Sequence, residues 1–521
     1  MQNLYTSKQI KKIDELANAK HHINPLILME NAATNVTSKI RNYIENKKLN
    51  VKKIAIFCGS GNNGGDGFVI AKQLSSDFEV SVFFVGTAKK FSQETTTNFN
   101  IINSINEIQI LQIENEKMLN DLELNFDCII DAIIGVGFSG ILNPFVTKII
   151  EKINSATALK IAVDIPTGLN SDAISLNNNA NQTIPNNIFN ADLTISILGA
   201  KIGMIFGTSK NFCGEIQVAE LAVGGNLANE NCTNFLLVKE DIHYIFPKRE
   251  ENSNKYDYGK VVVIAGSKNM AGAAALAANS AIKSGAGLVY LFSTNIHQAV
   301  LPEIITEKIA ETNDGSISNA NFRLLNNHIE KANSVIIGPG IGQNIETLEM
   351  VKKLVYPNLE KRIIIDADAL RAFDENVVLS KTIVLTPHFG EFTRLLNPSR
   401  NLTKNEIEEN KVEILQEIAS KMNCTILLKG QPTIISDGEK TYWNTFGNAG
   451  MATAGSGDVL SGIIGSLLAR QAHSNVAVHN ISEIVAFAAL FHSLSGDIYA
   501  EKYGMESLTA SELIKSFKYI V

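Results

Sequence analysis

The sequence predicts an α/β fold in two domains, each built on strands that alternate with helices. Short runs of β-branched residues end in glycine, proline or aspartate, and helical patterns lie between them, which is typical of buried parallel strands. A length of 521 residues exceeds what one hydrophobic core supports. The segment Gly224 to Asn234 is polar and lacks periodicity, so it marks the boundary. We therefore expect domains over residues 1–224 and 225–521.

Each half contains a series of expected strands. In the first half they are Lys53 to Cys58, Val80 to Val85, Phe126 to Ile130, Lys160 to Val163 and Asp192 to Leu198. In the second half they are Lys260 to Ile264, Leu288 to Phe292, Ser334 to Ile337, Arg362 to Ile365, Thr382 to Leu385 and Thr425 to Leu428. The asparagine-rich piece Leu176 to Asn187 reads as a surface loop. Binding sites in such sheets gather at the carboxyl ends of the strands.

Composition excludes several classes of protein. Hydrophobic residues make up 45% and charged residues 19% of the chain, which is ordinary for a globular protein. A net charge of -7, without a Lys/Arg cluster beside aromatic residues, argues against a nucleic-acid partner. The five cysteines are scattered without a C-x-x-C pair, which predicts a reducing compartment without disulfides or a zinc site. Residues 1–20 lack the apolar core of a signal peptide, so we expect a cytoplasmic protein without a membrane anchor.

A glycine-rich loop follows the first expected strand. Residues 59–67 read G-S-G-N-N-G-G-D-G and precede a helical pattern from Phe68 to Leu74. A strand, a glycine loop and a helix N-terminus in this order bind phosphates or dinucleotides. Asn62, Asn63 and Asp66 add amide and carboxylate oxygens that could hold a cation or a polar ring. Taken alone, the loop could equally be a structural turn.

Two further acids stand at the ends of later strands. Asp131 precedes a second glycine loop, Gly135 to Gly140, and Asp164 lies in V-D-I-P-T-G-L-N, where Pro166 stiffens the turn. Each acid could be a turn residue or a helix cap. Three such features at successive strand ends favour a binding site instead.

These motifs carry a family resemblance over roughly residues 1–220. The strings C-G-S-G-N-N-G-G-D-G and V-D-I-P-T-G-L-N resemble the epimerase domain of the NAD(P)H-hydrate repair enzymes, a Rossmann-like domain that interconverts the R and S forms of the hydrated nicotinamide cofactor. The resemblance implies that Asp164 is the catalytic acid/base and also contacts the hydrate. The other implied hydrate contacts are Asn62, Asn63, Gly64, Gly65, Asp66, Gly135, Val136, Gly137, Phe138, Ser139, Gly140 and Ile141. The implied potassium ligands are Asn63, Asp131 and Thr167, with Thr167 standing where serine is commoner in the family.

The implied chemistry agrees with the residue types. Epimerising a hydroxyl-bearing carbon beside a ring nitrogen needs reversible proton transfers, which a positioned carboxylate can perform. A redox role is disfavoured because the loop departs from G-x-G-x-x-G and no acid about twenty residues on is clearly placed for a ribose hydroxyl.

The second half contains a glycine turn with an acid at its end. Gly455-Ser456-Gly457-Asp458 is followed at once by the apolar stretch Val459 to Leu468, so the turn opens a helix. Helix N-termini and glycine turns bind phosphate groups. The charge of Asp458 is unfavourable beside a merely bound phosphate, but the residue is well placed to take a proton from a hydroxyl that accepts a phosphoryl group. A capping aspartate in a tight turn is the competing interpretation.

Five ordered motifs of the second half carry a second resemblance, over roughly residues 230–521. They are G-P-G-I-G, D-A-D-A-L, T-P-H-F-G-E, K-G-Q-P-T and N-A-G-M-A-T-A-G-S-G-D-V-L-S-G. Together they resemble the ADP- or ATP-dependent NAD(P)H-hydrate dehydratases, which have a ribokinase-like fold. The order of the two halves is similar to that of the bacterial bifunctional repair enzymes. In that family the nucleotide phosphorylates the ring hydroxyl, and loss of phosphate restores the nicotinamide.

The second resemblance implies roles for individual residues. Asp458 would be the catalytic base, and the other implied hydrate contacts are Ala273, Gly340 and His388. The implied nucleotide contacts are Lys429, Gly430, Gln431, Pro432, Thr433 and Gly457, with the backbone N–H groups of residues 454–457 forming an anion hole. Magnesium would accompany ADP or ATP. The expected partners are therefore NADH and NADPH hydrates and an adenine nucleotide, and relatives suggest self-association.

Two alternatives stay open. The second half could be a ribokinase-type kinase of another small molecule, which would release a stable phosphorylated product. The first half could be a module that only binds nicotinamide nucleotides, although Asp164 argues against this.

Overall fold

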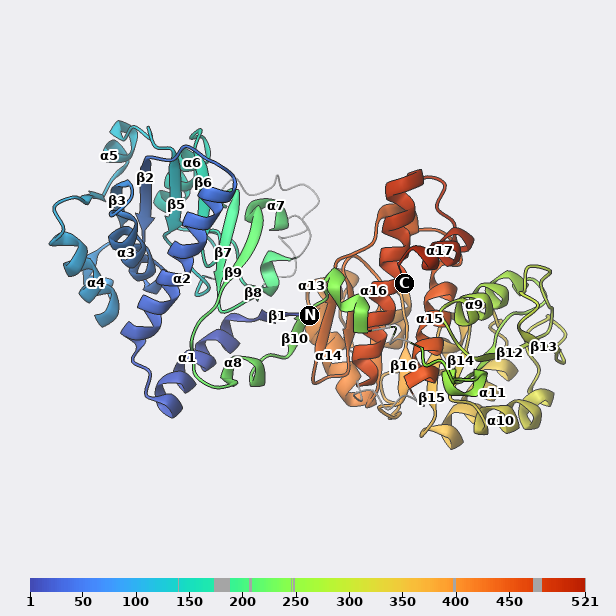
Figure 1. Ribbon diagram of the computed structural model, residues 1–521. Coiled ribbons are helices and arrows are strands. Elements are labelled where there is room, and N and C mark those ends of the chain that lie inside the picture. The colour runs from blue at the N-terminus through green and yellow to red at the C-terminus, as the bar shows by residue number, and fades with distance from the viewer. Residues whose placement is uncertain are drawn as a thin grey trace. The chain divides into compact units, whose positions relative to one another are not determined.

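A computed structural model describes residues 1–138, 140–172, 188–205, 209–244, 246, 249–396, 400–471 and 480–520 of the chain (Figure 1). Ser139 and the expected loop Leu176 to Asn187 lie outside the described residues. The contacts divide the chain into two compact units, Gln2–Thr233 and Asn234–Val521, with Met1 grouped in the latter. We call them the N-terminal and C-terminal units. Each has its own sheet and core, and the α/β class is confirmed for both.

The N-terminal unit contains a parallel sheet in the order β4-β3-β2-β5-β6-β7-β9. Its strands are β2 (Lys53–Cys58), β3 (Glu79–Val85), β4 (Gln109–Ile113), β5 (Cys128–Ala132), β6 (Leu159–Val163), β7 (Leu193–Ile197) and β9 (Glu215–Ala219). Outside this seven-stranded sheet, β1 (Gln2–Tyr5) pairs in parallel with β8 (Ala200–Lys201). The central strands match the predicted ones closely. The edge strands β4 and β9 were not predicted because most of their residues are only partly buried, which leaves no continuous apolar run.

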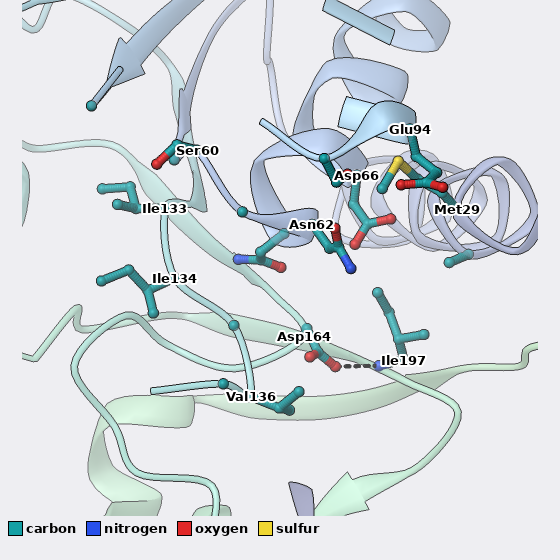
Figure 2. Close-up of a pocket in the computed structure, with 18 of the residues that line it drawn as sticks. Met29, Ser60, Asn62, Asp66, Glu94, Ile133, Ile134, Val136, Asp164 and Ile197 are labelled. Atoms are coloured by element: carbon teal, nitrogen blue, oxygen red, sulfur yellow. Dashed lines mark hydrogen bonds between the residues drawn. The ribbon is translucent and has the colours of Figure 1, made fainter. Parts of the chain in front are cut away.

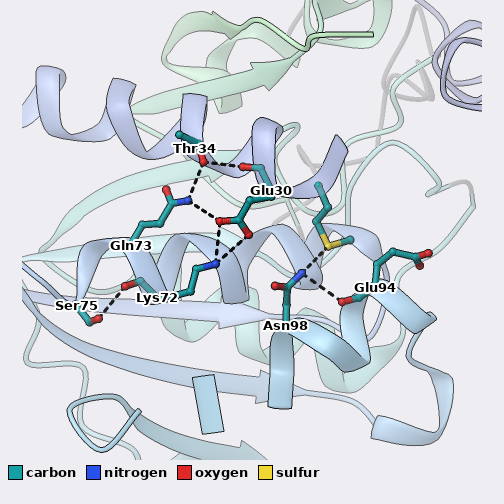
Figure 3. A network of polar contacts seen from close by, with 8 residues as sticks. Glu30, Thr34, Lys72, Gln73, Ser75, Glu94 and Asn98 are labelled. Carbon is teal, nitrogen blue, oxygen red and sulfur yellow. Dashed lines mark hydrogen bonds and ion pairs between the residues drawn. The ribbon is translucent and has the colours of Figure 1, made fainter. Parts of the chain in front are cut away.

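The helices of the N-terminal unit are α1 (Ser7–His21), α2 (Pro25–Asn46), α3 (Asn62–Leu74), α4 (Gln93–Asn103), α5 (Glu116–Asp121), α6 (Pro144–Asn154), α7 (Lys210–Cys213) and α8 (Leu227–Glu230). Helices α2, α3 and α4 contribute to one core cluster on the sheet, and α5 and α6 contribute to another. Polar contacts tie α2 to α3: Lys72 Nζ lies 2.8 and 2.9 Å from the two carboxylate oxygens of Glu30, and Gln73 donates to Thr34 at 2.8 Å (Figure 3). The position of α3 is thereby held at the carboxyl end of β2.

Helix α3 begins at Asn62, not at the predicted Phe68. The glycines that suggested a loop instead let the first turns of the helix pack against the sheet. A Cβ atom at Gly64 would lie 1.9 Å from the Gly59 carbonyl oxygen, and one at Gly67 would lie 2.6 Å from Cys58 Sγ. Close backbone approach, not a loop conformation, therefore explains these glycines.

The C-terminal unit has a mixed sheet in the order β13-β12-β11-β14-β15-β16-β17-β18-β19-β10. Its strands are β10 (Asn234–Leu236), β11 (Lys260–Ile264), β12 (Leu288–Ser293), β13 (Ile305–Lys308), β14 (Ser334–Ile337), β15 (Arg362–Ile365), β16 (Ile383–Leu385), β17 (Thr425–Leu428), β18 (Thr433–Ser436) and β19 (Thr441–Asn444). All the predicted strands form, and β11 to β17 pair with one another in parallel. Strand β18 runs antiparallel to both of its neighbours, β17 and β19. The β18–β19 hairpin was missed, although Asp437-Gly438 between two β-rich runs is a hairpin signal.

The helices of the C-terminal unit pack on this sheet. They are α9 (Ala271–Lys283), α10 (Phe322–Glu330), α11 (Ile345–Val355), α12 (Phe389–Leu395), α13 (Lys404–Glu409), α14 (Lys411–Met422), α15 (Ser456–Gln471), α16 (Ile481–Tyr503) and α17 (Ala510–Ser516). Helix α16 is long and apolar enough to cross a membrane by length and composition, and 78% of that apolar window is buried inside the protein. The helix is thus part of the core cluster that also contains Val459 and Ile463 of α15.

The C-terminal unit is expected to fold by itself, because it has its own sheet and core. A fragment of residues 234–521 should show a single cooperative thermal transition and dehydrate one hydrate epimer when nucleotide is present. Aggregation of this fragment, with full activity in the intact chain, would instead indicate that the unit depends on the preceding residues.

Candidate active sites

A cavity of about 1450 Å³ opens in the N-terminal unit, at the carboxyl ends of β2, β5, β6 and β7 (Figure 2). The structure brings together many of the predicted residues here. The predicted residues that line the cavity are Asn62, Asn63, Asp66, Gly135, Val136, Gly137 and Asp164. In Figure 2, Asn62 and Asp66 from α3 and Asp164 from the end of β6 project into the same space.

Other predicted contacts do not line this cavity. Gly64 and Gly65 are buried within α3, and Phe138, Gly140 and Ile141 follow the part of the second loop that does line it. Ile141 is 93% exposed. Ser139 lies outside the described residues.

Asp131 is fully buried at the end of β5 and links two loops. Its Oδ2 accepts the Thr167 backbone N–H at 2.7 Å, and its Oδ1 accepts the Thr167 hydroxyl at 2.7 Å and the Ile133 N–H at 3.1 Å. Burial raises the pKa of Asp131 to about 6, although these hydrogen bonds lower it. The sequence-predicted partners Asp131 and Thr167 are therefore in direct contact.

Asn63 supplies a buried amide group beside that pair of loops. Its Oδ1 and Nδ2 are both buried without a hydrogen-bond partner in the described part of the protein, which is costly unless a ligand satisfies them. The side chain contacts Gly135, where a Cβ atom would lie 3.3 Å from Asn63 Oδ1. Amide, carboxylate and hydroxyl oxygens are ligands for a hard cation. The residues present thus fit a monovalent cation, while the described residues contain no group of three His, Cys, Asp or Glu side chains that could hold a metal.

Asp164 occupies a strained backbone position at the cavity. Its φ of 68° lies in the left-handed region, which non-glycine residues rarely adopt. Its Oδ1 accepts the Ile197 N–H at 3.0 Å, the dashed contact in Figure 2, and also a bond from the Lys201 ammonium. The carboxylate is therefore held in one orientation by two donors.

Lys201 is fully buried, and it pairs with Asp164 in a salt bridge. The ammonium also donates to Ser196 Oγ and to the Ile197 carbonyl oxygen, each at 2.8 Å. Burial lowers the pKa of Lys201, whereas Asp164 opposes this shift. A buried charge is tolerated only where it is paired and hydrogen-bonded, so this lysine is committed to Asp164.

Two further carboxyl groups surround the Asp164–Lys201 pair. Asp66 and Asp14, from α3 and α1, line the same cavity. Burial, together with the charge of Asp164, raises the pKa of Asp66 well above its usual range and that of Asp14 to about 6. The cavity therefore places two carboxyl groups whose neutral forms are favoured by burial beside Asp164, which is paired with Lys201.

In the C-terminal unit, Asp458 lies in the first turn of α15, as predicted. Burial and the charge of Asp366 raise the pKa of Asp458 to about 7, although Lys429 lowers it. A carboxylate with a pKa near neutrality is suited to accept a proton at physiological pH.

Asp366 is buried and pairs with the partly exposed Lys429, and both act on the pKa of Asp458. Lys429 Nζ donates to Asp366 Oδ1 at 2.9 Å, and Ser461 donates to Asp366 Oδ2 at 2.6 Å. Burial raises the pKa of Asp366, but the charge of Lys429 together with these hydrogen bonds holds the pKa below its usual value. Lys429 Nζ lies 3.3 Å from where a Cβ atom of Gly457 would stand, so its charge is at the N-terminus of α15. Two phosphate-attracting features, the helix end and the lysine, therefore coincide.

The remaining predicted nucleotide residues follow Lys429 in sequence. The Thr433 hydroxyl donates to the Gly430 carbonyl oxygen at 3.0 Å, and Gln431 Nε2 donates to the Thr445 carbonyl oxygen at 3.0 Å. Pro432 lies between them, so the segment is a closed turn between β17 and β18.

His388 is beside Lys429, since the two residues form a parallel bridge. Its Nδ1 accepts the N–H groups of Gly390 and Glu391 at 3.0 and 3.3 Å, which makes it the N-cap of α12. The side chain is 59% exposed. His388 thus has a structural role already, and its ring also remains accessible.

Ala273 and Gly340, two further predicted hydrate contacts, lie next to each other. Gly340 has a φ of 63°, and a Cβ atom there would lie 3.2 Å from Ala273 Cβ. The two predicted contacts therefore form one surface, made of a helix start and a strand-end loop.

Comparisons with known proteins agree with this division into two sites. A family model described as NAD(P)H-hydrate dehydratase matches residues 261–518, and one described as YjeF-related protein N-terminus matches residues 25–203. A protein of Moorella thermoacetica named as a bifunctional NAD(P)H-hydrate repair enzyme is 33% identical, over 99% of this chain and 96% of its own length. The chain belongs to the bifunctional NAD(P)H-hydrate repair enzymes.

Solved structures similar to this repair enzyme cover about half of the chain. A ribokinase-like superfamily protein from Enterococcus faecalis is 28% identical over 55% of this chain and 95% of its own, with a TM-score of 0.48. An ADP/ATP-dependent NAD(P)H-hydrate dehydratase from Bacillus subtilis, co-crystallised with ATP and Mg²⁺, is 26% identical over 55% and 97%, with a TM-score of 0.44.

Sequence reasoning missed several residues of the repair enzyme's sites. Lys201 and Asp14 lie outside the glycine loops that pointed to the site. The sequence offers one signal for Lys201, its position shortly after the apolar strand β7, and none for Asp14. In the C-terminal unit, Asp497 accepts the Gly447 N–H at 2.8 Å and the Asn448 amide at 2.9 Å, and so fixes the start of the glycine turn. Its position on α16 could not be related to that turn without the fold.

Proposed function

We propose that this protein restores hydrated NADH and NADPH in two steps. The N-terminal unit interconverts the R and S hydrates, and the C-terminal unit dehydrates the S hydrate with an adenine nucleotide. The observation that supports this most is the presence of two separate carboxyl groups, Asp164 directly after β6 of the N-terminal unit and Asp458 in the first turn of α15 of the C-terminal unit. The family membership and the separate matches of the two halves agree with it.

In the first site, Asp164 would be the acid/base that moves protons at the hydroxyl-bearing ring carbon. Asp66 would supply a proton to the departing hydroxyl, because its burial favours the neutral acid. The carbon–oxygen bond breaks, the ring nitrogen stabilises the cation, and water returns on the other face while Asp164 takes its proton. The N-terminus of α3, whose N-cap Gly61 provides no side-chain bond, would accept phosphate oxygens of the dinucleotide.

Potassium would be held by Asn63, Asp131 and Thr167, and would supply a fixed positive charge at the cavity. Support comes from the unpartnered buried amide of Asn63 and from the oxygen-rich contact between Asp131 and Thr167. This chain's residues hold the two loops together even without the ion, since Asp131 accepts bonds from both Thr167 and Ile133.

The Asp131→Ala variant should therefore lose both loop order and the cation. We expect potassium activation of epimerisation to weaken by about 10- to 100-fold, with a higher KM for the hydrate. Epimerisation assayed against potassium concentration measures this, and dehydration by the C-terminal unit serves as the folding control. Normal epimerisation by the variant in potassium-free buffer would show that the metal assignment is wrong.

Lys201 would be a positioning residue that holds the Asp164 carboxylate in place. With Ile197 N–H it occupies Oδ1, so Oδ2 is the oxygen available to the substrate. In Lys201→Met this donor is lost, so kcat for epimerisation should fall by up to about 100-fold, while the KM for the hydrate should change little.

The matched control is Ser196→Ala, which removes one bond from Lys201 and none from Asp164. Its kcat and KM for epimerisation should stay close to those of the wild type. A Lys201→Met enzyme with the kcat of the wild type would show that the lysine does not position Asp164.

In the second site, the phosphates of ADP or ATP would lie between the N-terminus of α15 and Lys429. Asp458 would take the proton of the ring hydroxyl while the hydroxyl oxygen attacks the terminal phosphorus and the shortened nucleotide leaves. The phosphate group then departs with the electron pair of the carbon–oxygen bond. Loss of a proton from the neighbouring ring carbon restores the double bond. Phosphate leaves more easily than hydroxide, which explains the need for a nucleotide. Magnesium would be held mainly by the phosphates and would supply counter-charge to them.

The test is to incubate a mixture of both hydrate epimers with the protein and either ADP or ATP, and to follow reduced-nicotinamide absorbance. Complete recovery supports the proposal, and recovery of one epimer alone would mean that the first unit only binds nicotinamide nucleotides. A stable phosphorylated product would instead favour a ribokinase-type kinase. A cytoplasmic location and self-association stay predictions.

A further inference from the structure

A second cavity, of about 570 Å³, lies in the C-terminal unit where helices α9 and α15 end. Its lining includes five basic side chains and no carboxylate among the described residues: Arg249, Lys283, Arg470, Lys515 and Lys518. Arg470 is about 18 Å along α15 from Asp458, at the 1.5 Å rise per residue of a helix. The cavity is therefore separate from the site at the N-terminus of that helix.

Two guanidinium groups converge in this cavity. A Cβ atom at Gly285 would lie 2.6 Å from Arg470 Nη1 and 3.3 Å from Arg249 Nη2, so both groups reach the same point. Neither is paired with a carboxylate in the part of the chain that the structure describes. The bonds they make are long ones to backbone carbonyls, from Arg470 to Ser284 at 3.4 Å and from Arg249 to Gly285 at 3.3 Å. Most of the five N–H donors of each arginine thus remain available.

The carbonyls at the end of α9 attract positive charge, but they do not balance this cluster. A helix C-terminus carries about half a negative elementary charge, whereas each of the two converging guanidinium groups carries a full positive charge and the neighbouring lysines add more. Burial, with the charge of Arg249 in the same direction, lowers the pKa of Arg470 to about 10. The two arginines also lie over the Tyr258 ring, with Cζ at 4.0 Å for Arg249 and 5.8 Å for Arg470. Stacking fixes their planes and leaves their edges for a ligand.

We propose that this cavity binds an anion with more than one phosphoryl group. Lys283 and Lys518 line the same cavity and form no ion pair among the described residues, whereas Lys515 is paired with Glu512 at 2.7 Å. Two arginines and two lysines without acidic partners match the charge of a diphosphate or triphosphate better than that of a single phosphate. Planar arginine edges are also suited to pairs of phosphate oxygens.

Lysine footprinting on the intact chain tests this directly. The protein is acetylated in magnesium-free buffer, once with inorganic pyrophosphate and once without it. The modification of each lysine is then measured by mass spectrometry. Pyrophosphate should protect Lys283 and Lys518, while the exposed Lys440 on the β18–β19 turn should react as before. In Arg249→Gln, protection should need about tenfold more pyrophosphate, the loss of one charge-assisted contact.

Arg249 is exposed, so this variant should fold, and its nucleotide KM in dehydration should equal that of the wild type. Equal reactivity of Lys283 and Lys518 with and without millimolar pyrophosphate would overturn the proposal. Protection of Lys440 to the same degree would show that pyrophosphate only screens charge, which also contradicts the proposal. A higher nucleotide KM in Arg249→Gln would place the binding at the Asp458 site and would contradict the proposal as well.

Discussion

The Asp458→Asn variant is expected to bind nucleotide and yet dehydrate the hydrate about 10²- to 10⁴-fold more slowly, the usual contribution of a general base. Asparagine keeps the size and much of the hydrogen bonding of the aspartate at the first turn of α15, but it cannot take a proton. Nucleotide binding by calorimetry and dehydration by absorbance separate the two effects. Epimerisation in the other unit should be unchanged, and near-normal dehydration would show that the base lies elsewhere.

The wild type should reveal the same group in its pH profile. Burial raises the pKa of Asp458 to about 7, so the reactive ionised form is present above that pH and is lost as the pH falls through it. The dehydration rate should fall about tenfold per pH unit below the inflection, and Asp458→Asn should lack this limb. A wild-type profile that is flat between pH 5 and 8 would contradict the assignment.

The Asp164→Asn variant should lose epimerisation by about 10²- to 10⁴-fold, down to the spontaneous rate. Asparagine cannot serve as a base, and it no longer compensates the buried charge of Lys201, so the site should also lose local stability. The C-terminal unit should still repair the S hydrate, so a mixed sample should stop with the R hydrate left over. Recovery of both epimers faster than they interconvert spontaneously would rule out Asp164 as the acid/base.

The sequence predicts well which residues follow the strands, because glycine loops and acids after apolar runs are local signals. Asp131 and Thr167 meet as expected, and Asp458 opens α15. The length of α3 was underestimated because glycine spacing does not distinguish a loop from a helix that packs closely against a strand. Lys201 and Asp14 could not be predicted, since their importance comes from burial beside Asp164, which only the tertiary structure supplies.

Mixing two full-length variants, each impaired in one site, tests the central claim that independent sites in two units share the repair. Asp458→Asn alone should recover no reduced cofactor with nucleotide above the residual rate, and Asp164→Asn alone should recover only the S hydrate. Combined in one sample of mixed epimers, the two variants should recover the absorbance of both, because the first still epimerises and the second still dehydrates. Recovery by the mixture that stops where Asp164→Asn alone stops would contradict this division of the reaction.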